Sequence, residues 1–522
     1  MEFIQDNLLA FIVFFPALAG LIILMLPNDA TNTIRRLTFL LSLVPLIGTL
    51  LLWFNYNAEF RYGGGFAFEV QAEWFPALGS SFHMGLDGIS LVMFLLTTML
   101  TPLAILASFN IKEKVKMYMF LFLIMEMAML GLFASLDLLI FFIFWEFGLV
   151  PMYFLIRLWG GADRNYASFK FMIYTMAGSL GLLLSIQVMG LATGTYDIIE
   201  LMDVWVNLPA DATLAGTGIS VWAFKNIAFW AFVLAFAIKV PIWPFHTWLP
   251  DAHTQAPVAG SMMLAGVLLK LGAYGFLRLV IPLFPEHANW AAGTLATLGM
   301  LSIVMGGYAA FGQWNFKRLV AYSSINHMGF VVLGLAVTAY TYGRVDTFAD
   351  PKIAGDAIMA TNGAVMQMFN HGISAAAMFF LVGVLYERTH TLELKKYGGI
   401  WAIMPVFGAI FLFTSMSSLG LPGLNGFVGE YMVAQGSWDI FTIQLALSML
   451  GLLMTGAYIL KALGTTLHGP VKKEWMGLKD MTLREHMVIW PLMVLMLTLG
   501  IWPQWVLVFI NDTVTKSIFG LG

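Results

Sequence analysis

Runs of about 20 predominantly apolar residues recur from one end of this 522-residue sequence to the other. Each run is long enough to cross a hydrocarbon core roughly 30 Å thick as an α-helix. Lipid offers no partner for backbone N–H and C=O groups, so an open segment that spans it has to be helical. With 60% hydrophobic and 11% charged residues and a mean hydropathy of +0.84, the sequence predicts an all-α polytopic membrane protein.

The apolar pattern predicts fourteen transmembrane helices. They begin near Leu8, Leu37, Leu86, Met117, Leu136, Ala167, Asn226, Ala256, Asn289, Leu319, Met359, Ile400, Phe441 and Met487. When successive loops are assigned to alternate sides, 17 of the 26 Lys and Arg residues fall on one side and six on the other. Because basic loops stay in the cytoplasm, we expect a bacterial inner-membrane protein with both termini on the outer side. The segment before the first run is acidic rather than basic, so we expect that run to be a permanent helix and not a cleaved signal.

Two of the fourteen helices, the seventh and the twelfth, are predicted to be discontinuous. The seventh contains Pro241, Pro244 and Pro250, and the twelfth contains the sequence SSLGLPGLNGFVGEYM. Proline removes a backbone donor and clashes with the preceding turn, so such breaks survive at membrane depth only inside protein or beside a wet cavity. The two breaks lie in helices of opposite direction, which favours an inverted repeat with a central ion pathway.

Several ionisable residues fall deep inside these predicted helices. Glu146 stands nine residues from Asp137 and eleven from Arg157, or roughly 13 and 16 Å along a helix, which places it near the midplane. An ionised side chain there costs about 2.5–3.5 kcal/mol, so a compensating role is expected. Three more residues lie at similar depth: Lys270, His327 and His371.

Lys239 and Glu430 flank the two breaks. Lys239 ends one half-helix and Glu430 lies shortly after the start of another, so the helix dipole favours the charged form of each by up to ~2 kcal/mol. A structural ion pair is the alternative to a proton-carrying role for Glu146 and Lys239. The sequence leaves open the roles of Glu126, His371 and Lys461. We expect solvated side chains for four histidines in loops or at helix ends: His83, His287, His390 and His486.

The sequence contains no cysteine, which excludes disulfides, thiolate-held iron–sulfur clusters and Cys-based zinc sites. It also shows no Gly-rich dinucleotide or phosphate-binding signature after a strand. We therefore expect neither a cofactor nor a metal in this chain, and no nucleic-acid partner.

Four segments resemble a known family: residues 137–156 (DLLIFFIFWEFGLVPMYFLI), 239–278 (KVPIWPFHTWLPDAHTQAPVAGSMMLAGVLLKLGAYGFLR), 321–330 (AYSSINHMGF) and 421–431 (LPGLNGFVGEY). They are similar to the antiporter-like subunits of respiratory complex I, the NADH:quinone oxidoreductase. Relatives occur in multi-subunit cation/proton antiporters and membrane-bound hydrogenases. The resemblance covers the central five-sixths of the chain, and fourteen helices is the family's core number.

The resemblance implies two inverted five-helix repeats that form a proton channel. It divides the chain into N-terminal helices 1–3 (1–110), a first repeat (111–285), a second repeat (286–470) and a C-terminal helix (471–522). The implied proton-translocating residues are Glu146 with Lys239, then Lys270, then His327 as a link between half-channels, then Glu430 towards the outer half. Flanking membrane subunits of complex I are the implied partners.

The predicted function is proton translocation coupled to quinone reduction elsewhere in the complex. A subunit of a cation/proton antiporter or of a proton-pumping hydrogenase keeps the same fold and is the nearest alternative. A cytochrome-b-like electron carrier would need pairs of histidines at matched depth, and a haem spectrum would reveal it. A passive scaffold is the third alternative, although the buried charges argue against it.

Overall fold

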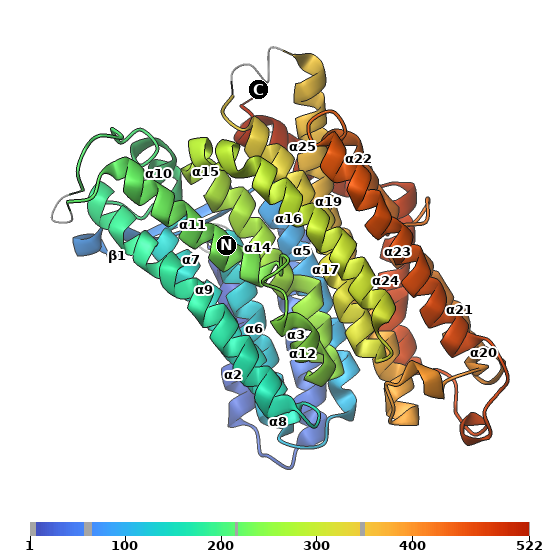
Figure 1. The fold of residues 1–522 in the computed structure, drawn as a ribbon. Coiled ribbons are helices and arrows are strands. Elements are labelled where there is room, and N and C mark those ends of the chain that lie inside the picture. Colours follow the sequence, from blue (N-terminus) through green and yellow to red (C-terminus); the bar gives the residue numbers. More distant parts are fainter. Residues whose placement is uncertain (1–6, 57–64, 215–217, 345–349, 521–522) are drawn as a thin grey trace.

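The chain forms a bundle of long helices, seen side by side in Figure 1. The computed structural model describes residues 7–56, 65–214, 218–344 and 350–520. Within these ranges, thirteen helical segments are long and apolar enough to cross a membrane. The span expected near Ile400 instead consists of a shorter apolar helix, Pro405–Leu419, followed by a break and a second helix.

The elements follow one another along the chain in this order: α2 (Leu8–Met25), α3 (Thr31–Asn55), β1 (Ala67–Phe75), β2 (Ser80–Leu86), α5 (Gly88–Ala107), α6 (Val115–Ala134), α7 (Leu138–Phe147), α8 (Leu149–Trp159), α9 (Arg164–Thr193), α10 (Ile198–Val204), α11 (Val221–Lys239), α12 (Trp248–Gln255), α13 (Val258–Met263), α14 (Leu269–Gly275), α15 (Ile281–Leu283), α16 (Pro285–Gly312), α17 (Phe316–Thr341), α19 (Pro351–Thr389), α20 (Ile400–Ile403), α21 (Pro405–Leu419), α22 (Asn425–Ser437), α23 (Thr442–Leu467), α24 (Leu483–Ile501) and α25 (Gln504–Thr513). Two wider π-helical stretches, Leu264–Leu268 and Phe276–Val280, connect α13, α14 and α15 into one span.

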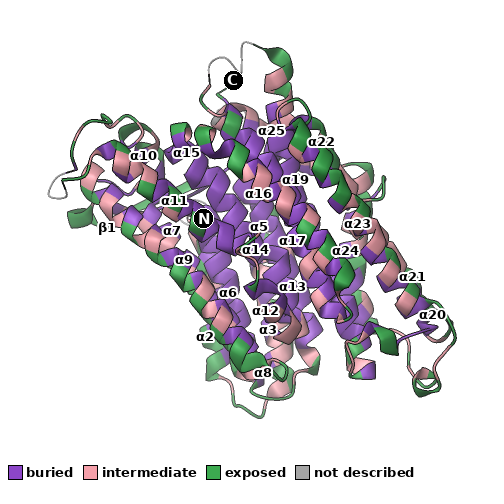
Figure 2. Cartoon of the chain, in the orientation of Figure 1, coloured by how far each residue is buried: buried purple, intermediate pink, exposed green. Residues whose placement is uncertain are grey.

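Burial separates the bundle into inner and outer helices (Figure 2). The inner helices α5, α6, α14, α17 and α19 are almost wholly buried, whereas α2, α3, α9, α23 and α24 expose apolar side chains along one side. Exposed apolar faces are what lipid or a neighbouring membrane protein covers. The inner helices include most of the deep ionisable residues predicted from the sequence, which are therefore surrounded by protein.

Both predicted helix breaks are present. α11 ends at Lys239 and α12 begins at Trp248, while α21 ends at Leu419 and α22 begins at Asn425. Side chains from neighbouring elements bind the freed backbone groups, as a break at membrane depth requires. The Oγ of Ser302 accepts a hydrogen bond from the backbone N–H of Trp243 at 3.0 Å, and Nδ2 of Asn370 donates to the carbonyl of Asn425 at 2.7 Å.

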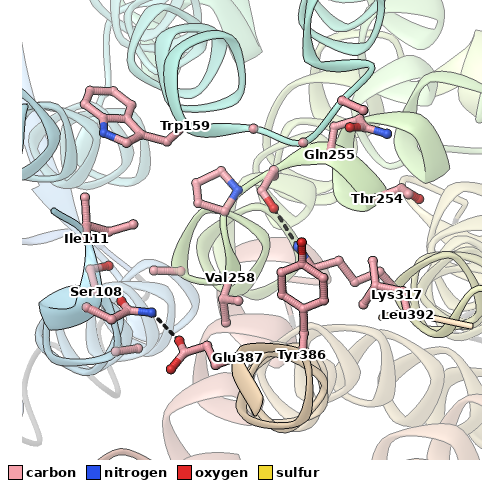
Figure 3. Close-up of a pocket in the computed structure, with 18 of the residues that line it drawn as sticks. Ser108, Ile111, Trp159, Thr254, Gln255, Val258, Lys317, Tyr386, Glu387 and Leu392 are labelled. Atoms are coloured by element: carbon pink, nitrogen blue, oxygen red, sulfur yellow. Dashed lines mark hydrogen bonds between the residues drawn. The ribbon is translucent and has the colours of Figure 1, made fainter. Parts of the chain in front are cut away.

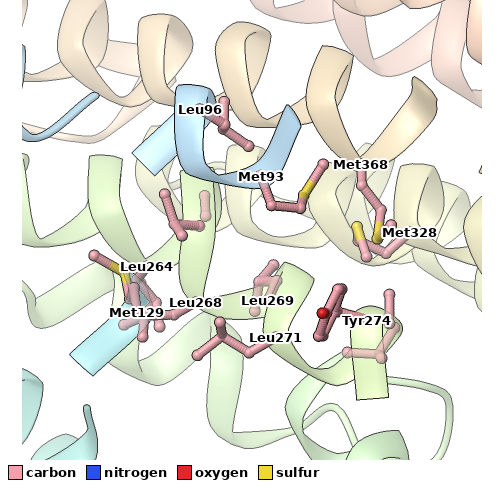
Figure 4. Packing of buried hydrophobic residues seen from close by; sticks show 14 of the residues in the cluster. Met93, Leu96, Met129, Leu264, Leu268, Leu269, Leu271, Tyr274, Met328 and Met368 are labelled. Atoms are coloured by element: carbon pink, nitrogen blue, oxygen red, sulfur yellow. The ribbon is translucent and has the colours of Figure 1, made fainter. Parts of the chain in front are cut away.

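Two glycines bring the eighth span and α19 into close contact at the centre of the bundle. A Cβ on Gly372 would lie 2.7 Å from the carbonyl oxygen of Gly266, and a Cβ on Gly266 would lie 2.6 Å from Leu100. Only residues without a side chain permit this approach. Figure 4 shows buried apolar side chains of the bundle, among them Met93 of α5, Leu264 of the eighth span and Met368 of α19.

A two-stranded antiparallel hairpin, β1–β2, precedes α5 and was not predicted by the sequence. The carboxylate of Asp137, the N-cap of α7, accepts hydrogen bonds from Oγ of Ser80 (2.9 Å) and the N–H of Ser81 (3.1 Å). A short helix, α25, follows α24 and also goes beyond the single C-terminal helix that we expected. Thr513 in α25 accepts a hydrogen bond from the N–H of Gly88, at the start of α5.

The expectation that His83 and His287 are solvated is wrong, because both are buried. Nδ1 of His83 in β2 lies 2.6 Å from the carboxylate of Asp197, and its Nε2 lies 3.7 Å from Glu69. Burial disfavours the imidazolium, but the hydrogen bond and charge of Asp197 outweigh burial and raise the pKa of His83. Burial opposes the charge on Asp197 as well, yet His83 and two backbone N–H groups lower its pKa.

We expect the hairpin to be held most firmly at mildly acidic pH. The raised pKa of His83 stabilises the fold fully below its unfolded value of 6.5, and this contribution is lost as pH rises through the folded value. The lowered pKa of Asp197 stabilises the fold above 3.8. Hydrogen exchange of the β2 amides, corrected for intrinsic rates, should show protection that falls as pH rises above 6.5. In His83→Gln the protection of these amides should be lower and should not change with pH. An unchanged pH profile in this variant would show that His83 does not cause the pH dependence.

Arg388 ties the end of α19 to the loop before α24. Its guanidinium donates two hydrogen bonds of 2.8 Å to the carboxylate of Glu485 and two more to the carbonyls of Lys479 and Asp480. Because Glu485 would be left buried without its counter-charge, Arg388→Ala should destabilise the protein by about 3–5 kcal/mol. Thermal unfolding in detergent measures this. The matched control is Arg484→Ala, whose pair with Glu387 is longer (3.9 Å) and about a third exposed, and which should cost about 1 kcal/mol or less.

Candidate functional site

Four ionisable side chains from four helices form a row through the buried centre of the bundle. Nζ of Lys270 on α14 lies 2.8 Å from Nδ1 of His371 on α19, whose ring centroid lies 5.7 Å from that of His327 on α17. Nδ1 of His327 lies 2.7 Å from Oε1 of Glu430 on α22. All four residues are at most 6% exposed. The row joins three of the predicted site residues and adds His371 between two of them.

Two polar side chains that sequence reasoning missed fix the Glu430 end of this central row. Nε2 of Gln367 donates to the same Glu430 oxygen at 2.9 Å, and the hydroxyl of Tyr458 lies 3.2 Å from Nε2 of His327. Both ring nitrogens of His327 are thus engaged, which sets the orientation of the imidazole. A lone Gln or Tyr in an apolar helix gives no sequence signal that separates this role from packing.

The central row has the chemistry needed to relay a proton. A charged Lys270 only donates hydrogen bonds, so Nδ1 of His371 accepts from it. An imidazole can take a proton on one nitrogen and release it from the other. A cavity of about 20 Å³, enough for the centre of one water molecule, is lined by His371, His327 and Glu430. A water there would be a partner for Nε2 of His371, which has no hydrogen-bond partner among the described residues.

Lys239 and Glu146 lie apart from the central row. Lys239 is the last residue of α11 and 2% exposed, and its ammonium lies 4.6 Å from the centre of the Trp145 ring. Glu146 on α7 is half-buried and acts electrostatically on Lys239. Nζ of Lys239 and Oε1 of Glu146 have no hydrogen-bond partner among the described residues. The pair implied by the family resemblance therefore lies within electrostatic range without a direct hydrogen bond.

Lys239 nevertheless packs directly against the helix of Lys270. A Cβ on Gly272 would lie 3.0 Å from Cβ of Lys239 and 2.8 Å from the carbonyl oxygen of Phe236. The end of α11 thus touches α14 two residues beyond Lys270. Lys239 occupies the last turn of α11, where the helix dipole favours a cation, as predicted.

Glu430 does not gain the helix-dipole stabilisation that we predicted for it. It is the sixth residue of α22, which begins at Asn425, and the first turn of that helix contains no acidic residue. The dipole effect fades beyond the first turn. The carboxylate is held instead by the hydrogen bonds of His327 and Gln367.

Two buried basic residues near the central row, His253 and Lys317, were also missed. His253 on α12 is fully buried, its ring stacks on Phe379 at 4.3 Å, and neither of its nitrogens has a partner among the described residues. Nζ of Lys317 on α17 donates to the carbonyl of Ala256 at 2.6 Å. Both Lys317 and Lys270 lie within electrostatic range of His253. The sequence predicted a basic loop for Lys317. It could not predict that Lys317 is buried, because this burial depends on the packing of α12.

A cavity of about 390 Å³ leads to Lys317 from the side of the basic loops (Figure 3). Its walls combine the end of α5, the end of α12, the start of α17 and the end of α19. Polar groups among its lining residues include Thr254, Gln255, Tyr386 and Glu387. The cavity is therefore suited to hold water beside Lys317.

The structure separates two ionisable residues whose roles the sequence leaves open. Nζ of Lys461 donates to the carbonyls of Phe311 and Gln313 (2.5 and 2.8 Å) and lies 3.9 Å from the Trp314 ring. It caps the C-terminal end of α16, which is a structural role. Glu126 on α6 is fully buried, and neither carboxylate oxygen has a partner among the described residues.

Comparison with known proteins identifies the family. A family model described as NADH:quinone oxidoreductase/Mrp antiporter, transmembrane, matches residues 135–346 and 352–455, a range that contains every member of the central row together with Glu146 and Lys239. The chain belongs to this family. NADH-quinone oxidoreductase subunit M of Rhodobacter capsulatus is 37% identical over 98% of this chain and 97% of that protein. NAD(P)H-quinone oxidoreductase chain 4 1 of Picosynechococcus sp. is 38% identical over 97% of this chain and 90% of that protein.

Solved structures agree with this family assignment. A chain of respiratory complex I from Thermus thermophilus with bound NADH superimposes with a TM-score of 0.84 at 29% identity, over 98% of this chain and all of that one. A chain of the Mrp complex from Dietzia sp. matches with a TM-score of 0.77 at 23% identity, over 98% of this chain and 52% of that one, and shows the shared fold alone. The predicted resemblance to the antiporter-like subunits of complex I is confirmed, and the relatives are named subunit M or chain 4.

Proposed function

We propose that this chain is a proton-translocating membrane subunit of an NADH:quinone oxidoreductase. The observation that supports the proposal most strongly is the central row of Lys270, His371, His327 and Glu430, buried within one bundle. Buried ionisable groups inside a membrane are expensive and are retained where ions or protons move. The proposed partners are the flanking membrane subunits of the complex and the lipid bilayer.

In the proposed mechanism, Glu146 controls the charge on Lys239. When Glu146 is close, its carboxylate favours the protonated lysine; when it moves away, burial favours release of the proton. The proton then passes through water to Lys270, along the central row and out by way of Glu430. Since Lys239 and Lys270 share no direct hydrogen bond, the mechanism requires ordered water between them.

The proton inlet is proposed to open on the side of the basic loops, which we assign to the cytoplasm of a bacterial inner membrane, with both termini outside. We propose that protons pass from the large cavity beside Lys317 to Lys270 by way of the buried His253, which lies within electrostatic range of both lysines. The route through Glu146 and Lys239 is the second proposed inlet. Either route delivers protons to the same central lysine.

The energy for pumping is proposed to come from partner subunits. Moving one elementary charge against 100 mV costs about 2.3 kcal/mol. A chain without cysteines has no thiolate-held cluster to supply that energy, and we assign it no redox cofactor of its own. Quinone reduction elsewhere in the complex would act on Glu146 and Lys239 by electrostatic or conformational coupling.

A subunit of a multi-subunit cation/proton antiporter is the second candidate, favoured by the family model, whose description includes the Mrp antiporters. The proteins that co-purify with this chain distinguish the two. Subunits that bind NADH and quinone support the first proposal, and a complex without redox subunits supports the second.

Glu146→Gln tests the proposed coupling between Glu146 and Lys239. The neutral amide no longer favours the charged lysine, and losing roughly 1.4 kcal/mol or more of this interaction should slow NADH-driven proton pumping at least tenfold. Lys239→Ala should give a similar loss. Pumping is measured in inverted membrane vesicles by the quenching of a pH-sensitive dye.

Glu474→Gln, which neutralises an exposed carboxylate in the loop before α24, serves as the matched control and should pump normally. Assembly of each variant is checked by co-purification of the complex. Normal pumping in both Glu146→Gln and Lys239→Ala, with an assembled complex, would refute the assignment.

A further inference from the structure

A second cavity, of about 410 Å³, opens where α11 and α16 begin. It is lined by Trp222, Asn226, Glu286, His287 and Trp290. Trp222 and Trp290 are 54% and 72% exposed. Tryptophan concentrates at the boundary between membrane and water, so this cavity lies at the depth of the lipid headgroups.

One half of the cavity is suited to a phosphate. His287 is only 8% exposed, its ring packs 5.8 Å from that of Phe229, and its Nε2 has no partner among the described residues. α16 begins beside it with Phe284 at the N-cap position and Pro285 as its first residue, so the N-cap side chain leaves the N–H groups of Glu286 and His287 uncapped. Free N–H groups at a helix N-terminus bind anions, and a protonated ring nitrogen of His287 would donate to the same oxygens.

The other half of the cavity is suited to an ammonium group. The exposed Glu286 lines the cavity together with Trp222 and Trp290, and aromatic rings next to a carboxylate attract a cation. The neighbouring Lys225 donates to the carbonyls of Val206 and Leu208 (2.8 and 3.4 Å) rather than forming an ion pair with Glu286. A negative charge and aromatic faces next to an anion-binding helix end are complementary to a zwitterion.

An apolar groove continues from this headgroup cavity between α11 and α16. Val233, Leu295 and Leu298 line it, together with Trp230. The Trp230 ring of the groove lies 6.2 Å from the Trp290 ring of the cavity, so the two are neighbours. A hydrocarbon chain that leaves the cavity would lie along the apolar surface of this groove, whose own volume is about 20 Å³.

We infer that this surface binds one molecule of phosphatidylethanolamine. The phosphate lies at the start of α16 beside His287, the ammonium lies between Glu286 and the two tryptophans, and one acyl chain lies in the groove. The inference is independent of proton translocation, since no member of the central row takes part. An anionic lipid such as phosphatidylglycerol lacks the ammonium and meets the charge of Glu286.

The test is photo-crosslinking in the intact, detergent-solubilised assembly with a phosphatidylethanolamine probe that carries a photoreactive acyl chain. We expect label on peptides from residues 221–239 or 285–312, displaced by excess phosphatidylethanolamine and not by phosphatidylglycerol. Glu286→Gln and His287→Phe should each reduce the label roughly tenfold, the usual effect of losing a hydrogen bond to a charged group.

Trp438→Ala is the control and should leave labelling unchanged. It removes a tryptophan at the end of α22 that is 54% exposed, as Trp222 is. If the variants fail to assemble, the competition between the two lipids in the unaltered protein still decides. Equal displacement by phosphatidylglycerol, labelling that is insensitive to both variants, or a protein neighbour crosslinked to position 290 would each overturn the inference.

Discussion

Lys270→Ala is expected to reduce NADH-driven proton pumping by roughly a hundredfold. Lys270 lies where both proposed inlets converge, and its ammonium is 2.8 Å from His371. Without a titratable side chain there, the proton would cross the bilayer centre as an uncompensated charge at a cost of about 2.5–3.5 kcal/mol, which slows a step about a hundredfold. The initial rate of pumping in inverted vesicles, per assembled complex, measures the effect.

Lys461→Ala is the matched control for this prediction. Lys461 also lies within an apolar helix, but it caps the carbonyls of Phe311 and Gln313 and does not touch the central row. It should lower thermal stability and leave pumping largely unchanged. Electron transfer from NADH to a soluble acceptor should be normal in both variants. Equal pumping by the two lysine variants would remove Lys270 from the pathway.

Glu430→Gln is expected to cause a loss of similar size, at the other end of the central row. The amide can keep the contacts with His327 and Gln367, so the fold should be retained, but it cannot release a proton. Without a group that releases the proton at the exit, pumping should fall by roughly a hundredfold. The estimate is again the free-energy cost of an uncompensated charge at the bilayer centre. The pumping rate and the assembly of the complex are measured together.

Glu430→Asp is the control that separates the need for a titratable carboxylate from the need for the exact length of the side chain. It restores a carboxylate on a shorter side chain, which lengthens the 2.7 Å contact with His327 without removing the titratable group. We expect partial recovery of pumping relative to Glu430→Gln. If pumping is lost equally in Glu430→Asp and Glu430→Gln, Glu430 has a packing role. Full pumping in Glu430→Gln would exclude Glu430 as the exit.

The fold was largely predictable because the membrane restricts the choices. Apolar runs of sufficient length have to be helices, and the prolines and glycines at 241–250 and 420–426 marked both breaks. The hairpin β1–β2 was missed because its short strands expose polar residues such as Glu69 and Glu73 and show no clear alternation. The count of spans differs at the twelfth helix alone, where the break divides it into α21 and α22.

The site was predictable in its members and not in its connections. The depth of Lys270, His327 and Glu430 follows from position along each helix, so the sequence could identify them. Their contacts depend on close packing of distant segments, as at Gly266 and Gly372, which no local pattern reports. For the same reason no local pattern indicated that Lys317 and His253 are buried, or that Lys461 caps a helix.

Proton translocation through this chain is tested most directly by looking for ordered water between Lys239 and Lys270. The two ammonium groups lie on helices that touch at Gly272, yet no hydrogen bond joins them. An experimental structure of the intact assembly, at a resolution that shows waters, should reveal a chain of waters from Lys239 to Lys270 and a further water between His371 and His327. A dry, side-chain-filled gap at both places would contradict proton translocation through this chain.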